Sequence, residues 1–127
     1  MVKVSWADTT CTIIQLDFER GWTWDDLRAA VEETDRMVAS QQHIVHLIID
    51  LRSGGGLPRN FISAAGDLFA SGEARSNEGQ RIVIGAGALM RTAYRGLLNV
   101  YGTHLKNRPF TFADTLEEAY RLLKPVL

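Results

Sequence analysis

The chain has 127 residues, of which 46% are hydrophobic, and its formal net charge is −1. This size and apolar content are enough for one domain with its own core, and the small net charge argues against a nucleic-acid partner. The one cysteine, Cys11, excludes an intrachain disulfide and favours a reducing compartment.

No apolar run approaches the roughly 20 residues that a membrane-spanning helix needs. The first six residues lack the long apolar segment of a signal peptide. We therefore expect a soluble cytoplasmic protein with no membrane span.

The N-terminal segment predicts a β-hairpin. Apolar residues alternate over residues 2–6, and a second strand is predicted for residues 11–18, with Cys11 as a small apolar strand residue. Residues 7–10, Ala-Asp-Thr-Thr, form a plausible turn between the two strands.

The hairpin is followed by the start signals of a helix. Thr23 suits the N-cap position, and the acidic Asp25 and Asp26 suit the positive end of the helix dipole. Trp22 precedes the cap and lies at the position of a hydrophobic staple. The apolar spacing predicts that this helix ends near Ser40.

Strands and helices then alternate to the end of the chain. The run from Ile44 to Leu51 is almost entirely apolar, which is typical of a strand covered on both faces. The later elements are predicted in this order: a helix beginning near Asn60, a polar loop at residues 72–79, a strand at Arg81–Gly85, a helix at residues 88–105, a strand at Phe110–Phe112, and a last helix capped by Thr115.

The sequence therefore predicts one α/β domain spanning residues 1–127, with the element order β-β-α-β-α-β-α-β-α. We expect a mixed, mostly parallel sheet with the N-terminal hairpin at one side.

Three stretches of the chain resemble the STAS and anti-sigma-factor-antagonist superfamily. They are the strand end Ile48-Ile49-Asp50-Leu51, the terminal segment from Phe112 to Ala119, and the segment from Trp22 to Asp26, which together with Leu57-Pro58 resembles a bacterial STAS-like subgroup. This resemblance implies a STAS-like fold and a regulatory or protein-binding role.

In regulatory STAS domains, a phosphorylatable Ser or Thr begins the helix after the strand that ends in Asp. Here the matching stretch is Pro58-Arg59-Asn60-Phe61, and neither Ser53 nor Ser63 matches in position. The resemblance thus implies a module without the phosphorylation switch. A more distant resemblance to lipid-carrier domains of the CRAL-TRIO type implies an alternative role, the binding of a small molecule or lipid.

Any ligand site should lie at the carboxyl ends of the strands, where open α/β sheets collect ligands. We predict that two loops form its walls, with two helix N-termini and nearby cations available for a small anionic ligand. A carboxylate such as Asp50 can bind a ligand there, or it can cap its loop by accepting backbone N–H bonds. One wall consists of Asp50, Arg52, Ser53, Gly54 and Gly55, and the other of Gly85, Gly87 and Arg91.

The sequence lacks the motifs of phosphate-binding, dinucleotide-binding and metal-binding sites. The glycine-rich loop at residues 54–56 lacks the Gly-Lys-Ser/Thr end of a P-loop, and the segment from Gly85 has Met90 where a dinucleotide fingerprint has its third glycine. His43, His46 and His104 lack metal-ligand spacing. We expect no metal, no cofactor and no catalytic residues.

These observations favour a non-enzymatic interaction or regulatory module, with a protein partner, and a homodimer as its assembly. One candidate dimer surface is the helix at residues 88–105, which carries Tyr94 and Tyr101. The other is a half-polar sheet face made of Cys11, Ile13, Gln15 and Asp17 from one strand and Ile44, His46, Ile48 and Asp50 from the next.

Overall fold

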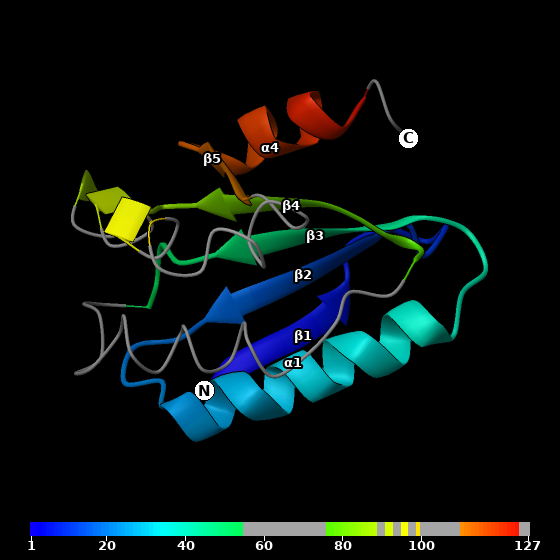
Figure 1. Ribbon diagram of the computed structural model, residues 1–127, viewed down its shortest axis with the longest axis horizontal. Coiled ribbons are helices and arrows are strands. Elements are labelled where there is room, and N and C mark those ends of the chain that lie inside the picture. Colours follow the sequence, from blue (N-terminus) through cyan, green and yellow to red (C-terminus); the bar gives the residue numbers. More distant parts are fainter. Residues whose placement is uncertain (55–75, 89–90, 93–94, 97–98, 100–109, 125–127) are drawn as a thin grey trace.

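The computed structural model describes residues 1–54, 76–88, 91–92, 95–96, 99 and 110–124. Its strands form one sheet in sequential order, in which β1 pairs antiparallel with β2 and all later pairs are parallel (Figure 1). The predicted α/β class and mixed, mostly parallel sheet are confirmed. The strands are β1 (Val2–Trp6), β2 (Ile13–Phe18), β3 (Val45–Asp50), β4 (Glu78–Ile84) and β5 (Phe110–Ala113).

Helix α1 (Trp24–Ala39) begins and ends as the sequence predicts. Thr23 is the N-cap, its side chain accepts from the Asp26 N–H, and the Asp26 carboxylate accepts from the Thr23 N–H in return. Ser40 is the C-cap. The ring of Trp22 is buried edge-on against Phe18, with 4.9 Å between centroids, and this contact fixes how the chain enters α1.

The two faces of the sheet carry separate apolar clusters. We call them the α1 face and the α4 face, after α1 and α4 (Leu116–Leu123), which lie on opposite sides of the sheet (Figure 1). α4 is capped by Thr115, as predicted. The α1 face buries Ile14, Leu16, Phe18, Val45 and Leu47, and the α4 face buries Ile13, Ile48, Ile82, Ile84 and Ala113.

The two remaining predicted helices fall mainly outside the described residues. The helix expected near Asn60 lies there entirely. Of the helix expected at residues 88–105, the structure shows the first turn, in which the Arg91 N–H donates to the Gly87 carbonyl at 3.1 Å. No helix among the described residues is long and apolar enough to cross a membrane.

The hairpin loop is longer than predicted, and Cys11 lies in it rather than in β2. The Asp8 carboxylate accepts from the Thr12 N–H at 3.0 Å and the Ile13 N–H at 3.2 Å, so the loop binds the amides just before β2 and at its first residue. Burial would raise the pKa of Asp8, but these bonds and those from the Thr10 and Thr12 hydroxyls lower it below its ordinary value. Cys11 has a φ of 56°, in the left-handed region.

Strand β4 begins three residues earlier than predicted, because the polar segment before Arg81 pairs with β3 through a bulge. The register shifts between Val45 and Leu47. His46 fills the irregularity: its Nδ1 accepts from the Gln80 N–H at 2.9 Å, and the side chain lies where Gly79 has no Cβ. A polar histidine is thereby held in a 4% exposed position between two strands.

Gly79→Ala should destabilise the fold by about 1–3 kcal/mol, as overpacking of a buried site does. An added Cβ would lie 2.3 Å from His46 Nδ1. The matched control is Gly87→Ala, since a Cβ there meets nothing within 4 Å. Urea denaturation should separate the two variants, and equal stability would refute this account of the bulge.

Candidate functional site

The carboxyl end of β3 carries a buried acid. Asp50 is 7% exposed and is the register partner of Asp17 at the end of β2. Register partners on parallel strands share a face, so both carboxylates lie on the α4 face. Ile84 is the next partner along this row, on β4. At one end of this row, α4 covers the buried Ile84. At the other end, the polar Asp17 is half-buried.

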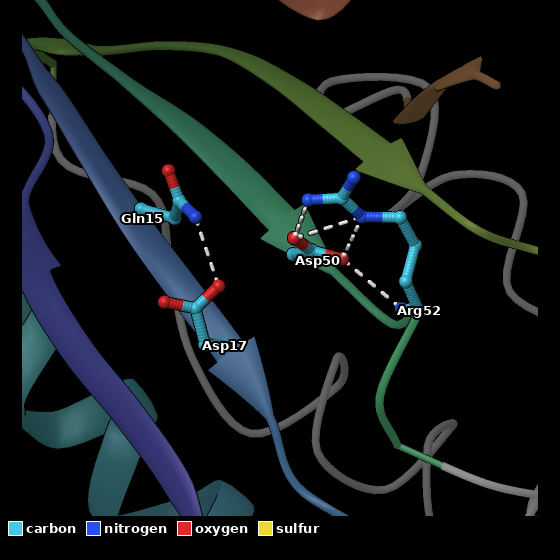
Figure 2. A network of polar contacts seen from close by, with 4 residues as sticks. All are labelled: Gln15, Asp17, Asp50 and Arg52. Carbon is cyan, nitrogen blue, oxygen red and sulfur yellow. Dashed lines mark hydrogen bonds and ion pairs between the residues drawn. The ribbon is translucent and has the colours of Figure 1, made fainter. Parts of the chain in front are cut away.

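Arg52 holds the Asp50 carboxylate with both its guanidinium group and its backbone N–H, and we call this contact the clamp (Figure 2). Its Nε lies 3.0 Å from Oδ1 and 3.2 Å from Oδ2, and a terminal nitrogen lies 2.7 Å from Oδ2. The Arg52 backbone N–H also donates to Oδ1 at 3.0 Å. Asp50 therefore caps the loop that follows its own strand, which is one of the two roles that the sequence left open.

The clamp keeps Asp50 charged. Burial alone would raise the pKa of Asp50, but the hydrogen bonds from the Arg52 side chain and backbone, and the charge of Arg52, together lower it. The pKa of Arg52 is raised by its bonds to Asp50 and the attraction of that carboxylate, with a smaller contribution from Asp17. Both members of the pair are thus fixed in their ionised forms near neutral pH.

The two predicted walls of the site meet at Gly85. This residue has a φ of 77°, and a Cβ built on it would lie 2.9 Å from the Arg52 backbone nitrogen and 2.7 Å from its Cγ. The Leu51 N–H donates to the Ile84 carbonyl at 2.9 Å just before this contact. Only glycine fits both the backbone conformation and the close approach of Arg52.

Gly54 anchors the other end of the Arg52 loop on the α1 face. A Cβ on this buried glycine would lie 3.1 Å from the Phe18 Cβ and 3.4 Å from the Trp22 indole nitrogen. Its N–H donates to the Leu51 carbonyl at 3.0 Å. The loop from Asp50 to Gly54 is therefore fixed at both ends, with Ser53 exposed between them.

The structure does not bring every predicted residue to Asp50. Arg91 lies 5.2 Å over the Phe112 ring and 3.4 Å from the Asp114 carboxylate. Phe112 is the partner of Val83, which pairs with Ile49, so this group belongs to the α1 face, opposite Asp50. Gly87 is exposed, and Gly55 lies outside the described residues.

Sequence reasoning missed Asp17 and Gln15 as members of the site. The Gln15 amide donates to the Asp17 carboxylate at 2.8 Å, and both side chains lie on the α4 face beside the Asp50–Arg52 pair (Figure 2). The signal was present, because both residues belong to the alternating half-polar set on the second strand. The alternation alone does not show that these residues lie near Arg52. The strand register shows it, because it places Asp17 beside Asp50.

In the described part of the chain, no three His, Cys, Asp or Glu side chains are grouped so that they could hold a metal ion. The arrangement is instead a fixed arginine with a second carboxylate beside it, on a firmly anchored loop.

Comparisons with family models, curated proteins and solved structures found no match for this chain. The STAS-like resemblance therefore stays a prediction.

Arg52→Gln should raise the pKa of Asp50, since burial would persist while the opposing bonds and charge are lost. A lowered folded-state pKa stabilises the fold above the unfolded pKa, roughly 4, and this contribution disappears as the pH falls through the folded value. The variant should thus lose about 1–3 kcal/mol at pH 7 and less at pH 3.

The measurements are the carbon-13 NMR titration of the Asp50 carboxyl and urea denaturation at both pH values. Arg20→Gln, which removes an exposed arginine, is the control and should change stability by less than about 0.5 kcal/mol. An Asp50 titration that Arg52→Gln leaves unaltered would show that the clamp does not set the charge of Asp50.

Proposed function

We propose that this chain is a non-enzymatic protein-interaction or regulatory module of the STAS-like type, without the phosphorylation switch. The observed order of elements supports the proposal, since a hairpin leads into parallel strands that lie in sequential order. Ser53 is exposed in the turn after Arg52. Ser63 and Asn60 lie outside the described residues.

The proposal rests on the structural role of Asp50, which holds Arg52. Its carboxylate accepts from both the backbone and the guanidinium of Arg52, and its pKa is lowered. A general acid or base instead needs a pKa near the working pH and a free path to a substrate proton. The bonds of Asp50 instead fix the position of Arg52.

The side chains around this support form a fixed pattern of charge. The Arg52 side chain is 48% exposed, but its charge is neutralised by Asp50. The charge of Lys3 is likewise paired, with the Glu19 carboxylate 3.4 Å away. Among the described residues Asp17 is in no ion pair: its carboxylate accepts from the Gln15 amide and attracts Arg52, which is already paired with Asp50. Such a pattern favours a partner surface that offers a lysine or arginine to Asp17.

Asp17→Asn should therefore weaken capture of the partner protein from a lysate of the native host and leave the fold intact. Quantitative mass spectrometry of the proteins retained on the immobilised chain measures this. The control is Asp25→Asn, which changes the net charge equally at a 93% exposed side chain on α1. Retention by the wild type should fall as salt screens the contact.

Two outcomes would contradict the proposal. One is equal retention of the same protein by the wild type and Asp17→Asn. The other is a small molecule or lipid bound stoichiometrically in native mass spectrometry, with no protein retained. That second result would favour the carrier alternative.

A further inference from the structure

Gln15 orients the carboxylate of Asp17. The two residues are two positions apart on β2, so their side chains share the α4 face, and the Gln15 amide nitrogen donates to Asp17 Oδ1 at 2.8 Å. An ionised carboxylate only accepts hydrogen bonds, so this contact fixes which end of the amide faces Asp17. The Gln15 carbonyl oxygen is therefore turned away from the carboxylate (Figure 2).

The Gln15–Asp17 pair leaves two acceptors unused. In the part of the chain that the structure describes, no hydrogen bond reaches the Gln15 carbonyl oxygen or Asp17 Oδ2. Neither oxygen is among the fully buried side-chain atoms that lack a partner there, so both keep contact with solvent. The pair thus presents two accessible acceptors, and one of them belongs to a charged group.

The neighbouring charges are already paired with one another and leave Asp17 unpaired. Its register partner on β1 is Lys3, whose ammonium group lies 3.4 Å from the Glu19 carboxylate. Its register partner on β3 is Asp50, which is paired with Arg52. These five side chains together carry one negative charge in excess, and it lies at Asp17. A cation with several hydrogen-bond donors complements this arrangement.

We propose that the group bound by Asp17 and Gln15 is an arginine of the partner protein rather than a lysine. This inference rests on the proposed function, which gives Asp17 a cationic contact. A guanidinium is a planar fork of five N–H donors, so it can donate to Asp17 and to the Gln15 carbonyl at the same time. The donors of an ammonium diverge from a single atom.

The burial of the pair favours the same choice. Gln15 and Asp17 are both half-buried, so a cation that binds them gives up part of its water. A guanidinium is more weakly hydrated than an ammonium and loses less by this. Hydrogen-bond geometry and desolvation therefore both select arginine.

Two capped peptides of equal charge test this selection. One is Ala-Ala-Arg-Ala-Ala, and the other has lysine in place of the arginine. Titration at low salt, followed by the backbone amide NMR signals of residues 15–19, should show the arginine peptide binding about three to ten times more tightly, the ratio that one additional hydrogen bond supplies. Equal affinities, or no shift of these signals with either peptide, would overturn the proposal.

Gln15→Met tests the part that Gln15 has in this selection. Methionine has a similar length but neither donates to Asp17 nor offers a carbonyl oxygen. The ratio of the two affinities should fall to about one, a change that a purely structural role of Gln15 would not produce. A ratio that stays at the wild-type value would refute the proposal. If the variant does not fold, the comparison on the wild type still decides.

Asp17→Asn separates failure of this proposal from failure of the proposed function. It should weaken binding of both peptides, because both need the charge of Asp17. Two peptides that bind the wild type equally and are both weakened by Asp17→Asn would refute the preference for arginine and leave the cationic contact standing. Peptide binding that Asp17→Asn leaves unaltered would refute both.

Discussion

The ion pair between Asp50 and Arg52 is the contact on which the carboxyl edge of the sheet depends. It turns the end of β3 into a closed loop, because the same carboxylate holds both the backbone and the side chain of Arg52. Gly85 fits against the backbone of Arg52, so the exit of β4 is fixed by the same contact. A buried charge that is fully bonded in this way can be tolerated, whereas an unpaired one at this depth would destabilise the fold.

The α4 face divides into two halves of different chemistry. Over β4 and β5 it is apolar and covered by Ala119 and Leu123 of α4, both of which are fully buried. Toward β1 it carries Lys3, Ser5, Gln15 and Asp17, which are exposed or half-buried. Asp50 and Arg52 lie where the two halves meet. The clamp thus links the core to the polar surface that the proposed function uses.

In the part of the chain that the structure describes, the sequence predicts most of the regular elements, because their signals are local. The cap of α1 at Thr23 and the cap of α4 at Thr115 are read from residues within one turn of the helix start. The apolar run of β3 is equally local, and Asp50 stands at its end as predicted.

The features that the sequence does not predict depend on residues far apart in the chain. The early start of β4 depends on His46, which lies 34 residues before its partner Gln80. The grouping of Asp17 with Asp50 follows from strand register, and the separation of Arg91 from Asp50 follows from which face each strand position occupies. Cys11 leaves its predicted strand because the Asp8 side chain competes for the amides of the loop.

A double-mutant cycle with Asp50→Asn and Arg52→Gln, measured by urea denaturation at pH 7, tests the central claim most directly. If the clamp holds the carboxyl edge together, each single change should cost about as much as both together. The coupling free energy should then be about 1–3 kcal/mol. Costs that simply add, with a coupling near zero, would show that Asp50 and Arg52 stabilise the fold independently and would contradict the account.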